Sequence, residues 1–143
     1  MPGLVVNAAE AMEARKPLDP GEYHAVLTGH KVKAAVSADK FPSIVAEFTV
    51  HQDEGKPYAG KKAFRTLNSS PDALPFMVAA AITLGADPEE VTGTSVDFDA
   101  VFQQLQGSEC WLRTSIREWQ RNPNDAAQQQ TNIDDILAQP SGA

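Results

Sequence analysis

The chain has 143 residues, a formal net charge of −7 and one cysteine, Cys110. Its length fits a single domain with a sizeable core. The lone cysteine excludes an intramolecular disulfide framework and a thiolate metal cluster. The net charge by itself argues against nucleic-acid binding, because phosphate binding needs a basic surface. Such binding stays open if the basic residues gather on one face.

No apolar run of the sequence suits a signal peptide or approaches the roughly 20 residues of a membrane-spanning helix. The longest run, from Leu74 to Leu84, is interrupted by Pro75 and Thr83. We therefore expect a cytoplasmic protein.

The first part of the chain predicts a weakly structured segment followed by a strand. Residues 1–16 show little apolar periodicity and are predicted to be a mobile N-terminal segment. From 22 to 33 the pattern has period two, with Tyr23 and Leu27 on the same face. Gly29 inside this run predicts a bulge or bend of the kind that curves a sheet towards a barrel.

Two further strands are predicted over 43–52 and 61–67. The first alternates clearly between apolar and mixed positions from Ile44 to Val50. The polar residues 52–57 between the two strands are rich in turn formers, so the pair is expected to form a long hairpin with a basic tip.

Helix is predicted only between 72 and 106. A Ser-Pro-Asp sequence at 70–72 is typical of a helix start, and Gly85 marks the end of that helix. Asp87 and Asp97 are expected to begin two further short helices.

The last predicted strand runs from 109 to about 120, and residues 123–143 are predicted to be a mostly disordered, Gln-rich acidic tail. Within this tail the acidic and apolar segment 133–137 has two interpretations. It recruits replication or recombination proteins, or it forms a small docking helix.

Strands, then helices, then a strand predict a mainly β fold with an α insertion. The best match is an OB-like curved antiparallel sheet or barrel, with the helices between the third and last strands and one domain over 17–122. Only four strands can be assigned from the sequence, so closure of the barrel is an inference.

The sequence offers no enzyme site, and we expect no catalysis, no cofactor and no metal. His24, His30 and His51 have no metal-ligand spacing, and each is interpreted as a surface strand residue. The sequence contains no phosphate-binding glycine loop and no nucleophile elbow. Cys110 lies in an alternating apolar run and is expected to be buried.

One face of the last predicted strand carries tryptophan and arginine together, which suits binding of single-stranded nucleic acid. Tryptophan stacks on any base, and arginine contacts phosphates. The candidate binding residues on this face are Trp111, Arg113, Arg117, Trp119 and Arg121. The alternative is structural: the helices or the N-terminal segment cover the tryptophans, and the arginines pair with neighbouring carboxylates.

A second basic cluster surrounds the first strands and the long hairpin. In an OB barrel these parts flank the binding face, but lysines also protect exposed sheet edges. Tyr58 at the hairpin tip either stacks on a base or packs onto its own loop. The candidate binding residues here are Lys31, Lys33, Tyr58, Lys61, Lys62 and Arg65.

Short motifs in a fixed order give the chain a family resemblance over residues 17 to 122. They are Leu18-Asp19-Pro20-Gly21-Glu22-Tyr23, the strand Ile44–Val50, Tyr58-Ala59-Gly60-Lys61-Lys62, Leu84-Gly85 and Leu105-Gln106-Gly107. In these pieces the sequence resembles a family of small phage-encoded single-stranded-DNA-binding proteins. The resemblance implies an OB-like fold, no catalysis and a location in the host cell cytoplasm, but no specific binding residues.

The sequence therefore predicts a sequence-tolerant single-stranded-DNA-binding protein that supports phage DNA replication or recombination. The alternatives are a phage structural or capsid-decorating protein, and an adaptor or inhibitor that binds a host protein through the Trp–Arg face. Whether the chain forms a homo-oligomer is left open by the sequence.

Overall fold

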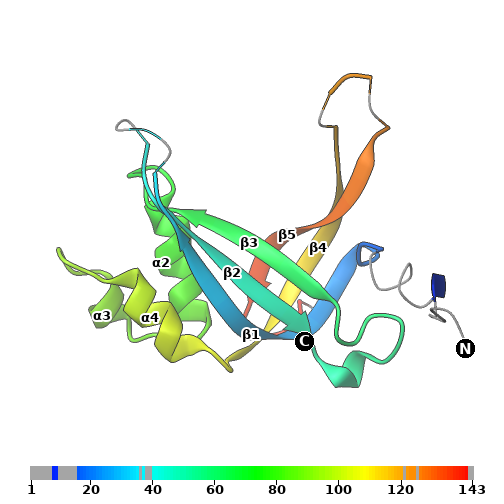
Figure 1. Ribbon diagram of the computed structural model, residues 1–143. Coiled ribbons are helices and arrows are strands. Elements are labelled where there is room, and N and C mark those ends of the chain that lie inside the picture. Colours follow the sequence, from blue (N-terminus) through cyan, green and yellow to red (C-terminus); the bar gives the residue numbers. More distant parts are fainter. Residues whose placement is uncertain are drawn as a thin grey trace, which may run out of the picture.

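The computed structural model describes residues 8–9, 16–35, 37, 40–120, 122–124 and 126–141. Among these residues, five antiparallel strands form one strongly curved sheet in the order β3-β2-β1-β4-β5 (Figure 1). The strands are β1 (Gly21–Lys33), β2 (Ser43–Val50), β3 (Lys62–Asn68), β4 (Glu109–Trp119) and β5 (Gln128–Leu137).

The two edge strands of this sheet, β3 and β5, contact each other, so the sheet curls into a partly open barrel. The guanidinium group of Arg65 on β3 donates a hydrogen bond to the backbone carbonyl of Ile133 on β5. This strand order, with helices inserted between β3 and β4, is the topology of an OB fold. The expected mainly β, OB-like fold class is thus confirmed.

The helical insertion contains α2 (Leu74–Thr83), α3 (Pro88–Val91) and α4 (Phe98–Leu105), and a short 3-10 helix, η1 (Gln52–Glu54), follows β2. The Asp87 carboxylate accepts a hydrogen bond from the backbone at the start of α3, and that of Asp97 does so for α4, as predicted. Met77 and Phe102 of this insertion are buried in the core of the barrel. Among the described residues, no helix is long and apolar enough to cross a membrane.

The core is built by strand alternation. Ala25 and Leu27 on β1, Phe48 on β2 and Leu112 on β4 are fully buried, and they lie on the inner face of the barrel. Cys110 is buried among them, as the sequence predicted.

A β-bulge in β1 changes which residues of this strand point outward. The register with β2 shifts between Leu27 and Gly29, so Thr28 is the extra residue, and the bulge predicted at Gly29 is confirmed. Beyond the bulge, Lys31 pairs with Val45 and Lys33 pairs with Ser43. Directly paired residues share a face, so both lysines lie on the outer surface of the sheet.

The prediction of a mostly disordered tail is wrong for residues 128–137, because these residues form β5 and complete the barrel. The docking-helix interpretation of 133–137 is wrong for the same reason. Asp134 has no partner in the β4–β5 register, which forms a bulge that lets both Ile133 and Ile136 pair with inward-facing residues of β4. In the sequence these two isoleucines are three positions apart, a spacing typical of a helix.

The predicted mobile segment 1–16 lies outside the described residues except for Ala8, Ala9 and Lys16. From Lys16 the chain packs onto the barrel. Leu18 is buried with Tyr23 and Val50 in a small second apolar cluster.

The role of β5 in the core is testable by truncating its buried side chain. We expect Ile133→Ala to lower the free energy of unfolding by about 2–5 kcal/mol, because it removes apolar contacts from a site that cannot fully collapse. Gln130→Ala, on an exposed position of the same strand, is the control and should change it by less than about 0.5 kcal/mol. Urea denaturation measures both. Equal, small effects would show that 128–137 is not part of the core.

Candidate nucleic-acid interface

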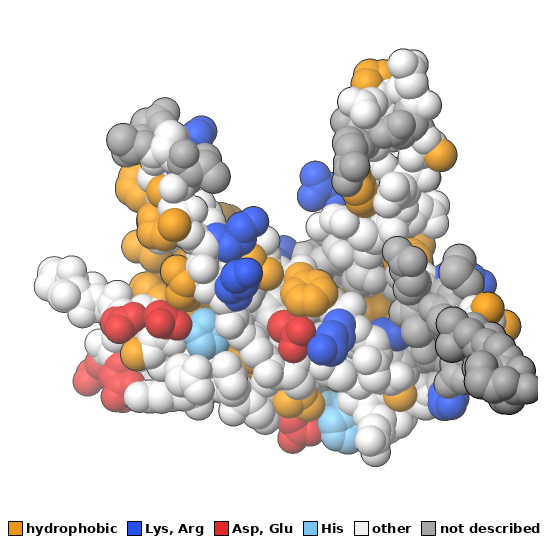
Figure 2. Space-filling model, viewed as in Figure 1, with side chains coloured by type: hydrophobic (Ala, Val, Ile, Leu, Met, Phe, Trp, Pro, Cys, Tyr) orange, Lys and Arg blue, Asp and Glu red, His pale blue; other side chains and the backbone are white. Residues whose placement is uncertain are grey.

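Two hairpins project from the same side of the barrel, and the space-filling view shows a hollow between them (Figure 2). They are the distal parts of β1–β2 and of β4–β5, and β3 runs between their bases (Figure 1). Figure 2 shows lysine, arginine and hydrophobic side chains on the surface between the two projections, with acidic side-chain atoms among them. In OB folds, oligonucleotides bind over the β2–β3 face between the β1–β2 and β4–β5 loops.

A groove of about 500 Å³ opens where β3 meets β5. Residues 61–66 on β3 and its approach and residues 129–133 of β5 line it, and its described lining residues include no aspartate or glutamate. The cations that line this β3–β5 groove are Lys16, Lys61, Lys62, Arg65 and Arg117. The groove thus brings together four of the predicted site residues. Lys61, Lys62 and Arg65 come from β3 and its approach, and Arg117 comes from β4.

The cations of the groove differ in how firmly the protein holds them. The guanidinium of Arg65 is half-buried and tied to β5, and the ammonium of Lys61 donates to the backbone carbonyl of Lys16 at 3.0 Å. The Lys62 ammonium lies 3.4 Å from a Glu47 carboxylate oxygen but remains largely exposed. Arg117 is exposed, and no carboxylate of the described residues forms an ion pair with it.

Phe64 is the aromatic side chain of this face, and sequence reasoning missed it. It lies on β3 between Lys62 and Thr66, and 55% of its surface is exposed. A phenylalanine that shares the polar face of a strand was a visible signal, because the buried residues Ala63 and Leu67 occupy the alternate positions.

Lys31 and Lys33 lie on the projecting part of β1, and both are exposed. Val32 between them is 46% exposed, because the hairpin extends beyond the core. Both lysines share the outer surface of the β1–β2–β3 sheet with Phe64, since Lys31 pairs with Val45 and Val45 pairs with Thr66.

Trp111 lies on a different part of the barrel and does not line the groove. Its ring stacks on His24 with centroids 5.2 Å apart, and His24 stacks on His51 at 4.4 Å. A hydrogen bond with His24 lowers the pKa of Asp53, which lies beside both imidazoles. Half-buried Trp111 is therefore part of a stack with two histidines, and not a core residue covered by the helices as the sequence-based alternative had it.

The histidines are not the isolated surface residues that the sequence suggested. His24 and His51 are brought together by the pairing of β1 with β2. The side chain of His30 is only 5% exposed, and its Nε2 lies 2.6 Å from an Asp99 carboxylate oxygen. The side-chain amide of Gln106 contacts the other ring nitrogen at 3.1 Å.

The candidate residues that share one face of β4, here called the β4 stripe, are Trp111, Arg113, Arg117 and Trp119. Those other than Trp111 also lie in different surroundings from one another. Arg113 is held by carboxylates, at 3.4 Å from Glu22 and 2.9 Å from Asp135, as the structural alternative predicted for it. Trp119 is half-buried near the end of the β4–β5 hairpin, where it pairs with Gln128. Arg121 lies outside the described residues.

Tyr58 packs neither outward nor onto its own loop, but against Tyr23 of β1 and the segment that precedes this strand. Its ring lies 5.2 Å from that of Tyr23, and its hydroxyl donates a 2.6 Å hydrogen bond to an Asp19 carboxylate oxygen. This hydrogen bond raises the pKa of Tyr58, and burial raises the pKa of Tyr23 to about 12. The acidic segment of the tail is likewise engaged, because Asp134 and Asp135 contact β4 side chains.

Many exposed acidic side chains lie away from the groove, whereas Glu47 lies beside Lys62. The helical insertion and its loops present a series of exposed carboxylates, namely Asp72, Asp87, Glu89, Glu90, Asp97 and Asp99. The negative net charge of the chain is therefore compatible with a basic groove, because the two signs of charge occupy different parts of the surface.

No protein-family model matches this sequence, and no curated protein matches it. Among solved structures, the chain is similar to a chain of the structure described as yeast RPA bound to ssDNA. The sequence identity is 14% and the TM-score 0.42, over 95% of this chain and 88% of that chain. The assignment of the OB fold rests on strand order, closure and the position of the helical insertion, and not on this similarity.

Cys110 is the single thiol of the chain, and its burial determines its chemistry. Desolvation raises the pKa of Cys110 to about 12, and the thiolate is the reactive form. We therefore expect the native protein not to react with Ellman's reagent at pH 8, and the urea-unfolded protein to react with one equivalent. Rapid labelling of the folded protein would contradict the burial of Cys110.

Proposed function

We propose that this protein binds single-stranded DNA without strong sequence preference and has no catalytic activity. The observation that carries the proposal is the β3–β5 groove of an OB barrel. In the part of the chain that the structure describes, this groove is lined by five cations and no carboxylate, next to the exposed ring of Phe64. These features form one continuous surface of the protein.

A single strand suits this surface better than a duplex does. The exposed Phe64 ring offers a stacking partner to an unpaired base, whereas the faces of paired bases are covered by their neighbours in a duplex. Lys62 and Arg117 carry exposed charges on either side of the groove, where the backbone phosphates of the same strand would pass. The lysines of the β1–β2 hairpin, Lys31 and Lys33, would extend the path.

The expected recognition is tolerant of sequence because its components are. Stacking on an aromatic ring accepts any base, and ammonium or guanidinium groups on phosphates read no base identity. The polar side chains of Gln129, Gln130 and Asn132 line the β5 wall of the groove and add hydrogen-bonding capacity.

The biological role within this proposal is support of phage DNA replication or recombination in the host cytoplasm. It is based on the short motifs of the sequence that resemble a phage-encoded family. Two of these motifs contribute directly to the fold and the groove. Leu18 and Tyr23 of the first are buried in the second apolar cluster, and Lys61 and Lys62 of the third line the groove.

The stacking part of the proposal is testable with one pair of phenylalanines. We expect Phe64→Ala to weaken binding of a fluorescein-labelled oligothymidine by about 1–3 kcal/mol, as measured by fluorescence anisotropy. Phe76→Ala is the matched control, because Phe76 is 64% exposed on α2 and outside the groove. Equal affinities for both variants and the parent protein would exclude Phe64 as a stacking platform. Preference for duplex would overturn the proposed function.

The electrostatic part is testable with a pair of arginines from the same strand. Arg117→Ala should lower the slope of log affinity against log salt by about one unit, because one phosphate contact is lost. Arg113→Ala should leave the slope nearly unchanged, because Arg113 is already paired with Glu22 and Asp135. The reverse result would place the DNA path over the outer face of β1 and β4 instead of the groove.

A further inference from the structure

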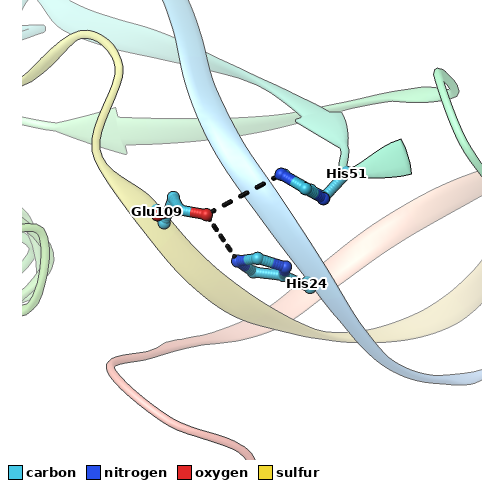
Figure 3. Close-up of side chains that lie close together, drawn as sticks. All are labelled: His24, His51 and Glu109. Atoms are coloured by element: carbon cyan, nitrogen blue, oxygen red, sulfur yellow. Dashed lines mark ion pairs between the residues drawn. The ribbon is translucent and has the colours of Figure 1, made fainter. Parts of the chain in front are cut away.

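Two histidines and a glutamate converge on the outside of the barrel, outside the β3–β5 groove (Figure 3). The Nε2 atom of His24 lies 3.0 Å from Oε1 of Glu109, and the Nε2 atom of His51 lies 3.8 Å from the same oxygen. One ligand atom of each residue lies within 4.8 Å of the other two.

Strand pairing fixes this convergence. His24 belongs to β1, His51 directly follows β2, and Glu109 begins β4. The backbone amide of His51 donates a 2.9 Å hydrogen bond to the carbonyl of His24. Because β1 lies between β2 and β4 in the sheet, the three side chains come from three adjacent positions of the barrel wall.

A second carboxylate orients both imidazole rings. Oδ2 of Asp53 lies 2.7 Å from Nδ1 of His24, and Oδ1 lies 3.1 Å from Nδ1 of His51. A proton on Nδ1 of His24 would donate to Asp53 and leave its Nε2 lone pair facing Glu109. Nδ1 of His51 accepts a 3.1 Å hydrogen bond from the backbone amide of Asp53, so metal binding at its Nε2 would shift the ring proton to Nδ1, where the Asp53 carboxylate would accept it. Histidines that bind metals commonly donate their second ring nitrogen to a carboxylate in this way.

We propose that His24, His51 and Glu109 form a binding site for a divalent transition metal of the zinc class. Two imidazole nitrogens and one carboxylate oxygen are a ligand set that Zn²⁺ accepts, at distances of about 2.0–2.2 Å. Small side-chain rotations towards a shared centre would bring the three atoms to these distances. Water would complete the coordination, since the side chain of Glu109 is 60% exposed.

Such an ion would connect β1, the end of β2 and the start of β4. A metal that binds the folded chain and not the unfolded chain stabilises the fold, by an amount that grows with the logarithm of the metal concentration above its Kd. The proposal is independent of DNA binding, because none of the three ligands lines the groove.

Trp111 provides a local reporter for the test, because its ring stacks on His24. In the full-length Trp119→Phe variant, Trp111 is the one remaining tryptophan. We expect Ni²⁺ or Cu²⁺ to quench its emission with a saturable, one-to-one titration, and Zn²⁺ in excess to restore the emission. Zn²⁺ should also raise the thermal midpoint of the parent protein by several degrees.

Substitution of the ligands distinguishes the site from adventitious binding. His51→Gln and Glu109→Gln should each weaken the titration at least tenfold, and both side chains are exposed enough for the fold to persist. His30→Gln is the control, because His30 lies outside the cluster, beside Asp99. Linear, unsaturable quenching would overturn the proposal. Equal metal affinity in all three variants would also overturn it, and the four side chains would then form only a network of ion pairs.

Discussion

The closure of β3 against β5 is the contact on which the shape of this protein depends. Ile133 is buried in the core from β5, and its backbone carbonyl accepts the hydrogen bond from Arg65. The same contact places the groove, because residues of both strands line it. Arg65 therefore acts twice: it joins the edge strands, and it contributes a cation to the surface that they enclose.

The distribution of charge follows from the architecture. A series of exposed carboxylates lies on the helical insertion, outside the groove, and cations lie on β3, on the β1–β2 hairpin and at Arg117. The bulge at Thr28 contributes to this separation. Without the extra residue, Lys31 and Lys33 would point to the opposite face of β1, because a shift of one residue exchanges the two faces of a strand. A net negative chain can thus present a basic surface to a polyanion.

The sequence predicted four strands, three helices and their order, because each has a clear period and clear caps. It did not predict β5, for a physical reason. The bulge at Asp134 breaks the alternation, and the polar residues Gln128–Gln130 lie beyond the core, where nothing requires them to be apolar. The basic cluster around Lys62 and Arg65 was found in the sequence, whereas Phe64 was not. The convergence of His24, His51 and Glu109 depends on strand pairing and is invisible to linear spacing.

The β4 stripe shows why residues on one face of a long strand do not always form one site. From Trp111 to Trp119 the strand spans about 26 Å, and strands twist progressively along their length. The stripe therefore begins beside β1, where Trp111 stacks on His24, and ends on a hairpin that projects beyond the core. Arg113 meets carboxylates of both neighbouring strands, whereas Arg117, four residues further on, reaches the groove. Alternation assigns a side chain to a face, but the curvature of the barrel determines which surface that face belongs to.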